Sequence, residues 1–321
     1  MAVGQTSRRG ANRMLAWLLR LLAGLCADTS WWFARALFVA AARWRMPRAG
    51  YRRSSRAPDR MALIAHRGAS VTLPENTLAA ALAALDAGAA GTEYDLQQLA
   101  CGTLVVLHDG TLRRTAHPGT HPNLLDVPIG QLRLQDVAHV DIGGEILPTF
   151  ARMLSTLLAR HPVRISFAEL KVGAGPTMVA EALRVVLEVG ANPEQIIFIC
   201  FDSNVCAQLK AGAPGYRVFL LGFCASEAGV RKTMEEALRL GIDGINVNAH
   251  PTAVTAAVVQ EVHLHGLAMA VWVYRAPAPN DCESVWDYME RVSVDYCTTN
   301  LPPEVHCWAA RAQATDPPNE I

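Results

Sequence analysis

The chain has 321 residues, of which 51% are hydrophobic and 18% are charged. This composition supplies enough apolar side chains for a large core and excludes a chain that is disordered throughout. Basic and acidic residues balance at 29 each, but residues 1–58 contain eleven arginines and one acidic residue, a net charge of +10, which leaves the rest of the chain at −10. We therefore expect a basic extension followed by an acidic globular body.

The basic extension, residues 1–58, alternates runs rich in leucine and tryptophan with arginines. Arg20, Asp28 and Arg35 interrupt these runs, so no stretch of about 20 apolar residues is left to span a bilayer. The pattern is typical of helices that lie on a membrane surface. A cleaved signal or organellar transit segment and an extra helix packed on the body also fit the pattern. The protein is then expected to be membrane-associated, exported or organellar, and otherwise cytoplasmic.

The globular body begins with a strand–helix–strand pattern. The apolar run at 61–65 has the length of a strand and ends in the motif HRG at 66–68. The motif PENT at 74–77 then opens a helix rich in alanine and leucine that stops at Gly88. A basic, polar motif therefore follows directly where a strand ends.

The second strand, predicted at 92–96, carries two acidic residues, Glu93 and Asp95. Because side chains alternate along a strand, both carboxylates point to the same side, where they repel each other unless a cation lies between them. A third run, at 103–107, ends in His108. In an α/β barrel the C-terminal ends of the strands form the active site, so these positions are candidates for catalysis.

The runs at 91–97 and 103–107 are separated by about five residues. This is too short for the crossover that parallel neighbours require, so one of the two strands must pair in a hairpin or lie outside the regular barrel. Residues 110–150 follow as a long insertion that contains several prolines and a Gly-Gly pair. The segment 163–171 resumes the strand pattern and carries Glu169 and Lys171, which face the same side. These charges would be paired if Glu169 bound a metal and Lys171 bound a phosphate. Alternatively, Glu169 and Lys171 would form a plain salt bridge with each other.

Four more strand-like runs alternate with helical segments, and a short run at 294–300 closes the pattern. The four runs are 195–201, 216–223, 241–248 and 267–274. This rhythm predicts an α/β fold, a TIM (β/α)₈ barrel over residues 59–303, with a small insertion at about 110–150 and the helical, basic N-terminal extension. Phe201 and Trp272 fall near strand ends and are candidates to line the pocket, and Trp272 lines either the pocket or the core. Residues 304–321 turn polar and are expected to form a C-terminal tail.

The motifs together resemble those of the glycerophosphodiester phosphodiesterase family. The resemblance covers roughly residues 61–303 and rests on HRG, PENT, the E-x-D of 93–95, VVLHD at 105–109 and the ELK of 169–171. It implies that His66 and His108 are the acid/base pair and that Arg67 and Lys171 bind the phosphate. It also implies a lid formed by the insertion and one divalent cation held by three acidic residues, which are Glu93, Asp95 and Glu169.

The chemistry of a phosphodiester calls for the same residue types. The substrate is already anionic, so hydrolysis needs positive charge on the nonbridging oxygens and proton transfer at the attacking and leaving oxygens. Arginine, lysine and a metal supply the charge, and two histidines supply the proton transfer. Three carboxylate ligands favour a hard cation, Ca²⁺ or Mg²⁺, over zinc. Trp272 is a further candidate for substrate binding.

The predicted function is therefore metal-dependent hydrolysis of a glycerophosphodiester or lysophospholipid to an alcohol and glycerol 3-phosphate, or to a phosphatidic-type product. Which histidine is acid and which is base stays open. A lipid phosphodiesterase of the sphingomyelinase D or phospholipase D type, or an inactive membrane-anchored barrel that acts as a binding protein, is the alternative. The expected partners are a small-molecule or lipid-derived phosphodiester and, through residues 1–58, a membrane surface, with no nucleic acid.

The sequence departs from the family pattern at several positions outside the proposed ligands. The closing T-D-x-P motif is here Thr299-Asn300-Leu301-Pro302, and Arg113-Arg114 replace an acid followed by arginine. Arg113 is either a second positive group beside the phosphate or a surface residue, and we favour the surface.

Overall fold

The computed structural model describes residues 60–117, 119, 121–171, 173–274 and 281–301. The basic extension 1–58 and the tail 304–321 lie outside the described residues, and the predictions made for them stay predictions. No described helix combines the length and the apolar character needed to cross a bilayer.

Eight parallel strands form a closed barrel, as the sequence predicts. Strand β1 (Ala62–His66) closes it by pairing with β2 (Gly91–Gln98) on one side and β9 (Tyr296–Thr299) on the other. The strands between them, in order from β2 to β9, are β4 (Ile165–Leu170), β5 (Ile196–Cys200), β6 (Arg217–Gly222), β7 (Gly244–Asn248) and β8 (Ala268–Trp272). Because all eight run parallel, their C-terminal ends meet at one end of the barrel, which we call the mouth.

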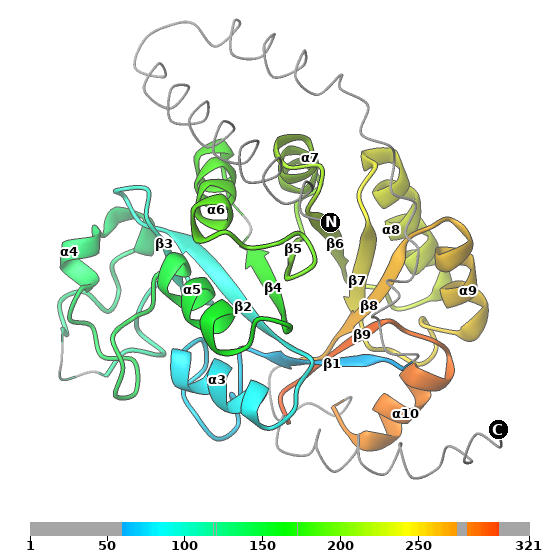
Figure 1. Cartoon of the computed structure of the whole chain (residues 1–321), viewed down its shortest axis with the longest axis horizontal. Coiled ribbons are helices and arrows are strands. Elements are labelled where there is room, and N and C mark those ends of the chain that lie inside the picture. Colours follow the sequence, from blue (N-terminus) through cyan, green and yellow to red (C-terminus); the bar gives the residue numbers. More distant parts are fainter. Residues whose placement is uncertain (1–59, 118, 120, 172, 275–280, 302–321) are drawn as a thin grey trace, which may run out of the picture.

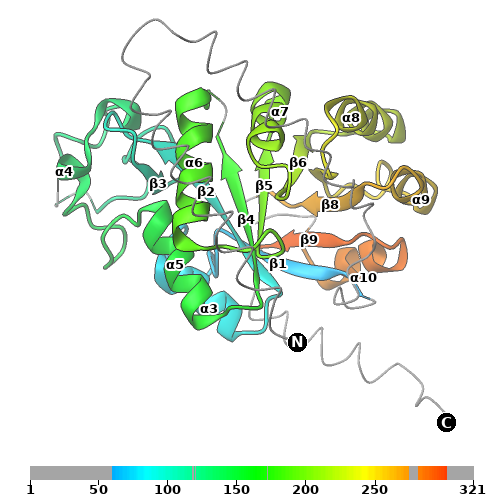
Figure 2. The same ribbon diagram turned by 45° about the horizontal axis from the view of Figure 1, so that its top comes forward.

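Helices form a layer around the strands (Figure 1), and Figure 2 shows the same layer from a second direction. They are α3 (Leu78–Asp86), α5 (Phe150–Arg160), α6 (Pro176–Val189), α7 (Ser203–Gly212), α8 (Glu227–Leu240), α9 (Ala256–Leu264) and α10 (Glu283–Arg291). Five of them begin at a side-chain cap that accepts a backbone N–H of the first turn, namely Thr77, Thr149, Asp202, Ser226 and Thr255. These caps set the position at which each of the five helices begins.

The ninth strand, β3 (Leu104–Val106), pairs antiparallel with β2 through a tight turn at 99–103. Gly102 adopts φ +87° in this turn, a conformation that favours glycine. The structure therefore confirms that one of the two closely spaced strands forms a hairpin outside the barrel of eight. The hairpin places His108 just beyond β3 and beside the C-terminal half of β2.

The insertion packs around a small core of its own beside β3. It contains the short helices η1 (Ile129–Gln131) and α4 (Leu134–Val137). The carboxylate of Glu145 accepts the backbone N–H groups of Leu78 and Ala79 at 3.1 and 2.8 Å, and this contact ties the insertion to the first turn of α3. A carboxylate at a helix N-terminus is favourable because it meets unpaired N–H groups and the positive end of the helix dipole.

Alternate residues of each strand face the inside of the barrel, where ten buried side chains form a compact cluster. Its members are Ala62, Ile64, Phe167, Ile197, Ile199, Phe219, Leu221, Ala268, Ala270 and Tyr296. The opposite faces of the strands pack against the helices in the larger core. The same alternation, followed along β1, β2 and β4 toward the mouth, places the side chains at positions 66, 93, 95 and 169 on the inward face. All four are predicted site residues.

Candidate active site

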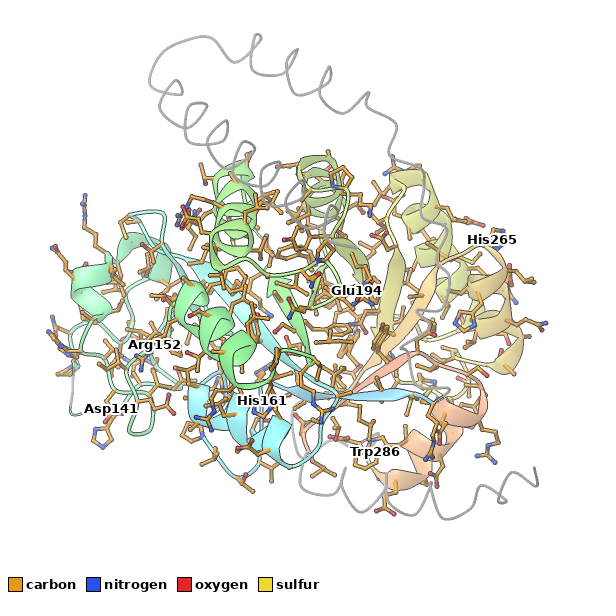
Figure 3. All side chains as sticks on the ribbon, in the orientation of Figure 1. Asp141, Arg152, His161, Glu194, His265 and Trp286 are labelled. Atoms are coloured by element: carbon orange, nitrogen blue, oxygen red, sulfur yellow. The ribbon has the colours of Figure 1, made fainter. Side chains whose placement is uncertain are left out.

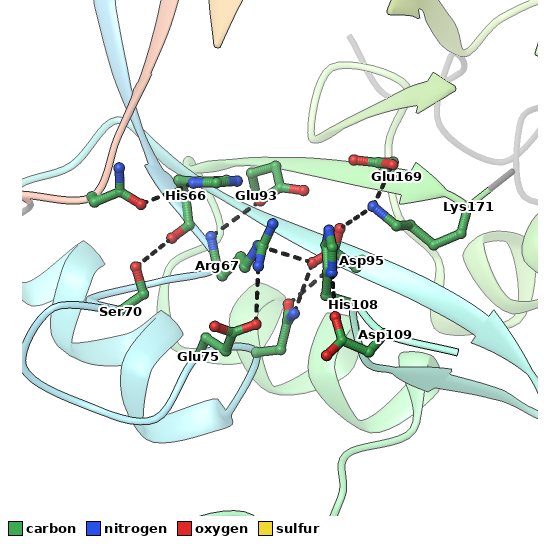
Figure 4. A network of polar contacts seen from close by, with 12 residues as sticks. His66, Arg67, Ser70, Glu75, Glu93, Asp95, His108, Asp109, Glu169 and Lys171 are labelled. Carbon is green, nitrogen blue, oxygen red and sulfur yellow. Dashed lines mark hydrogen bonds and ion pairs between the residues drawn. The ribbon is translucent and has the colours of Figure 1, made fainter. Parts of the chain in front are cut away.

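Three carboxylates meet at the mouth from two neighbouring strands. Glu93 and Asp95 extend from β2 and Glu169 from β4, and Asp95 pairs with Glu169 in the register of these strands. Each offers one oxygen, and these oxygens lie within 4.8 Å of one another. All three residues are buried. Figure 4 shows the three side chains together with the basic residues around them. The structure thus brings together the three residues predicted as metal ligands.

The carboxylates are not fully balanced by nearby positive charge. Burial, together with the charges of Asp95 and Glu169, raises the pKa of Glu93 well above its usual value. Burial and the charge of Asp95 also raise the pKa of Glu169 to about 7. Burial opposes ionisation of Asp95 as well, but Lys171 and Arg67 outweigh it and hold the pKa of Asp95 well below its usual range. A set of three buried carboxylate oxygens with surplus negative charge fits a hard divalent cation.

Lys171 lies against two of the three carboxylates. Its Nζ donates to Glu169 at 2.6 Å and to Asp95 at 3.0 Å. The salt bridge between Glu169 and Lys171, which the sequence left open, is therefore present, and Asp95 joins it. These charges raise the pKa of Lys171 despite its burial, so the side chain remains cationic. The predicted contact of Lys171 with a phosphate stays a prediction.

Arg67 reaches the same cluster from the loop that follows β1. Its backbone N–H donates to Glu93 at 3.1 Å, and its guanidinium lies 3.0 Å from Glu75 and 3.3 Å from Asp95. The backbone is left-handed here, with φ +59° at Arg67 and φ +77° at Gly68. A Cβ on Gly68 would lie 2.5 Å from the backbone carbon of Ala80 in α3, so only glycine lets this loop pack so closely.

The PENT motif, residues 74–77, holds two members of the cluster through hydrogen bonds. Asn76, also left-handed at φ +61°, donates its Nδ2 to Asp95 at 2.8 Å and accepts the backbone N–H of Asp95 at 3.2 Å. Glu75 accepts from Arg67, and Thr77 caps α3. The motif therefore fixes the orientation of one predicted ligand and one predicted phosphate-binding residue.

The two histidines differ in their hydrogen-bond partners. His66 Nδ1 lies 2.9 Å from Oδ1 of Asn300, a neutral amide, whereas His108 Nδ1 lies 2.6 Å from the carboxylate of Asp109. Burial and the nearby charge of Arg67 lower the pKa of His66 to about 4. Burial also lowers the pKa of His108, but the charge of Asp95 opposes this shift. Both rings stand beside the acidic cluster (Figure 4).

The amide of Asn300 is oriented by two further contacts. Its Nδ2 donates to Asp281 at 2.8 Å and to the backbone oxygen of Tyr274 at 2.7 Å. A reversed amide would turn its oxygen toward both of these acceptors, so Oδ1 must face His66. Since Oδ1 can only accept, the proton of neutral His66 lies on Nδ1 and its Nε2 carries the free lone pair.

Trp272 stands at the end of β8, partly buried at the mouth. Its indole N–H donates to the backbone oxygen of Gly222 at 3.3 Å, and the ring packs on the apolar cluster inside the barrel. The side chain therefore faces the mouth and not the helical layer.

Comparison with known proteins identifies the family of the chain. Residues 66–304 match the model of the glycerophosphoryl diester phosphodiesterase family. The chain belongs to this family. A bovine glycerophosphodiester phosphodiesterase 1 is 40% identical over 114 residues, which are 34% of each chain. A glycerophosphodiester phosphodiesterase from Caldanaerobacter subterraneus is 29% identical over 188 residues, 56% of this chain and 72% of the relative. The matches to the bovine, human and mouse relatives span about a third of their length.

Solved structures of the family share the fold. A putative glycerophosphoryl diester phosphodiesterase from Silicibacter pomeroyi superposes with a TM-score of 0.67 at 19% identity and covers 79% of this chain and 94% of its own. A phosphodiesterase from Oleispira antarctica, in complex with the product sn-glycerol-3-phosphate, superposes with a TM-score of 0.65 at 20% identity and covers 78% and 96%. At these identities the likeness shows the barrel fold alone.

Sequence reasoning missed one basic residue of the site. Arg113 is exposed and pairs with Asp126, in line with the favoured surface position. Its neighbour Arg114 instead donates to Glu75, at 2.8 Å from two nitrogens, and to Asp109 at 2.6 and 2.9 Å. The sequence held no signal to choose between two adjacent arginines, because the choice depends on how the insertion folds back on the PENT loop.

Proposed function

We propose that the protein is a metal-dependent phosphoric diester hydrolase that releases glycerol 3-phosphate from a glycerophosphodiester. The observation that carries the proposal is the convergence of three buried carboxylates, two cationic side chains and two imidazoles at one barrel mouth. Membership of the family and the names of the relatives support the substrate class. The product bound to the Oleispira antarctica neighbour supports glycerol 3-phosphate as the released phosphate ester.

Glu93, Asp95 and Glu169 would hold one divalent cation, Ca²⁺ or Mg²⁺. When bound, the cation neutralises charge on the phosphate oxygens. Arg67 is positioned to contribute further positive charge, because its guanidinium is already fixed by Glu75 and Asp95 at the edge of the cluster. Lys171 contributes in the same way from the opposite edge. Fixed positive groups stabilise a phosphoryl transition state without having to reorganise during the reaction.

The hydrogen bonds support one division of the two proton-transfer roles. His66 presents an unprotonated Nε2, and its neutral amide partner and the nearby Arg67 both disfavour a charged ring. His66 is therefore the base that accepts the proton of the nucleophile, which is water or a neighbouring hydroxyl of the substrate. His108 is paired with Asp109, whose pKa is held at about 2 by Arg114 and by His108 itself. This permanent carboxylate compensates the charge of a protonated His108, so His108 is the acid that protonates the leaving alkoxide.

The assignment is tested with two substrates that differ in the leaving group. Glycerophosphocholine needs a proton on its leaving oxygen, whereas a p-nitrophenyl diester of glycerol 3-phosphate releases a phenolate that is stable without one. We expect His108→Ala to lose about 10²–10⁴-fold in kcat with glycerophosphocholine and to recover most of the loss with the p-nitrophenyl ester. We expect His66→Ala to be impaired with both.

The matched control is His265→Ala. His265 lies on the outer surface at the end of α9 (Figure 3), where its Nδ1 contacts only the backbone of its own helix. This variant should hydrolyse both esters at the wild-type rate. The reverse pattern, with His66→Ala recovering on the p-nitrophenyl ester, would exchange the two roles. Near-wild-type activity of both variants on glycerophosphocholine would remove the proposed function.

A further inference from the structure

Four aromatic rings lie at the mouth beyond the ends of β5, β6 and β8. They are Phe201 after β5, Phe223 after β6, and Trp272 and Tyr274 at and after the end of β8. Phe201 stacks on Phe223 with ring centroids 5.2 Å apart. Trp272 meets Phe223 edge to face at 4.9 Å and Tyr274 at 5.2 Å. We call these four residues the aromatic wall.

The wall belongs to the inside of the barrel by its register. Phe201 comes two residues after Ile199, and Phe223 comes two residues after Leu221, both of which point inward. Because side chains alternate, the rings also belong to the inward face. Phe201 and Trp272 pack directly on the inner cluster. The aromatic wall therefore extends the apolar interior of the barrel toward the mouth. It faces the space into which the substrate must enter.

Much of this apolar surface has no partner among the residues that the structure describes. The exposed fraction is 69% for Phe223 and 47% for Tyr274. Every other phenylalanine that the structure describes is buried or partly buried. Large exposed rings grouped beside a cluster of charged side chains are typical of a surface that binds an apolar ligand.

A short hydrogen-bonded path joins the aromatic wall to the proposed base. The backbone oxygen of Tyr274 accepts from Nδ2 of Asn300, and Oδ1 of the same amide accepts from His66. The wall therefore begins one side chain away from the imidazole at which the reaction is expected to occur. A substrate whose phosphate lies at the carboxylates can reach the wall with its remaining part.

We propose that the aromatic wall binds a hydrocarbon chain of the substrate, so that the preferred substrates are phosphodiesters with an alkyl or acyl chain. This inference deepens the proposed function and rests on it. A quaternary ammonium group would need rings arranged around an open space. Here the rings touch one another edge to face and by stacking, which closes that space and leaves a continuous apolar surface. Such a surface suits a flexible chain that can lie along it.

The test uses short n-alkyl esters of glycerol 3-phosphate, from methyl to octyl, at concentrations where they are monomeric. With the wild type and added Ca²⁺ or Mg²⁺, kcat/KM should rise about two-fold for each added CH₂ group, because each one removes apolar area from water. Lysophosphatidylcholine with a hexanoyl or octanoyl chain forms the second arm. It places the chain on the glycerol and not on the leaving alcohol, so the arm with the steeper rise identifies which part of the substrate meets the wall.

Phe223→Ala is the informative variant, since a ring that is this exposed contributes little to the stability of the fold. We expect the octyl-to-methyl ratio of kcat/KM to fall at least about ten-fold, and we expect Phe223→Leu to keep most of the ratio because it keeps apolar area. The control is Leu264→Ala, which removes another exposed apolar side chain at the end of α9. It should leave the ratio unchanged.

Three outcomes would overturn the inference. A wild type that hydrolyses every ester with the same kcat/KM leaves the proposed function standing and removes the role of the aromatic wall. An unchanged ratio in Phe223→Ala does the same. A wild type that hydrolyses no ester with any metal removes the proposed function, and the inference falls with it.

Discussion

The two halves of the barrel mouth are built in opposite ways. In the charged half, formed by β1, β2, β4 and the loop after β3, nearly every side chain is held by another through an ion pair or hydrogen bond. In the aromatic half, formed by the ends of β5, β6 and β8, the rings hold one another by packing and leave apolar surface exposed. Under the proposed function, the charged half supplies the groups that any phosphodiester needs, and under the further inference the aromatic half distinguishes one diester from another.

The largest expected effect comes from removing a negative charge from the charged half. Asp95→Asn deletes the carboxylate that contacts Arg67, Asn76 and Lys171. We expect kcat/KM to fall by about 10³-fold or more for every ester, short or long, because the loss concerns the common chemistry. Rates across the alkyl series would show it. Glu235→Gln, at an exposed position of α8, is the control, and a loss that varied with chain length would contradict the division.

The second prediction concerns the backbone that holds the charged half. Gly68→Ala should lower the free energy of unfolding by about 2–4 kcal/mol, because it combines a left-handed φ with a contact of 2.5 Å to α3. Gly241→Ala is a matched control, since Gly241 has φ +67° with no atom near the added Cβ, and it should cost only about 1 kcal/mol. Urea unfolding of both variants measures the difference. Equal costs would show that the close packing of the HRG loop on α3 is not required.

The charged half could be predicted from the sequence because its residues occur in short motifs. HRG, PENT and E-x-D each fix several members of the cluster within a few positions, and strand alternation then places Glu93 and Asp95 on one side. The barrel and the hairpin followed from the rhythm and spacing of the strands. Glu169 and Lys171 could be placed because they too lie two residues apart on a strand.

The aromatic half could be predicted only in part. Trp272 was a candidate, but the sequence could not choose between pocket and core, because that choice depends on which rings from other strands arrive beside it. Phe223 and Tyr274 lie beyond the strand ends, where no short-range pattern marks a neighbour. For the same reason the sequence did not reveal the contacts of Arg114 or the contact of Asn300 with His66, which joins positions 234 residues apart. The change from aspartate to Asn300 was visible in the sequence, but its partner was not.

The third prediction sharpens the role of Asn300 at the boundary of the two halves. With saturating metal, the acidic limb that His66 sets in the wild type should lie near the pKa of His66, about 4, because the base must be unprotonated. Asn300→Asp places a carboxylate beside the ring, which raises the pKa of His66 and should move this acidic limb upward by about 1–3 pH units. The pH dependence of kcat/KM with glycerophosphocholine measures it.

The exposed Asn192, in the loop that enters β5 at the end of the barrel away from the mouth, supplies the control. Asn192→Asp adds the same charge far from the mouth and should leave the limb in place. An acidic limb that does not move in Asn300→Asp would mean that His66 is not the base. Loss of activity at every pH, with no change in the shape of the profile, would point to the same conclusion.

The smallest expected effect concerns Asp109, which is partly exposed. Arg114, followed by His108, lowers the pKa of Asp109 from 3.8 to about 2. A lowered carboxylate pKa adds stability above the unfolded value, and that stability is lost as the pH falls through about 2. Asp109→Asn should therefore lower Tm by about 1–3 °C at pH 5–7, and the difference from the wild type should shrink as the pH approaches 2. A difference that grew toward low pH would contradict the pairing with Arg114.

The central claim, that Glu93, Asp95 and Glu169 hold one cation on which hydrolysis depends, is tested most directly by a metal titration. Glycerol 3-phosphate release from glycerophosphocholine would be followed in the protein stripped with EDTA while Ca²⁺ or Mg²⁺ is added back. We predict no turnover in the stripped protein and saturable recovery with one ion bound per chain. Turnover that survives removal of the metal, or recovery that is equally complete in Glu169→Gln, would contradict the claim.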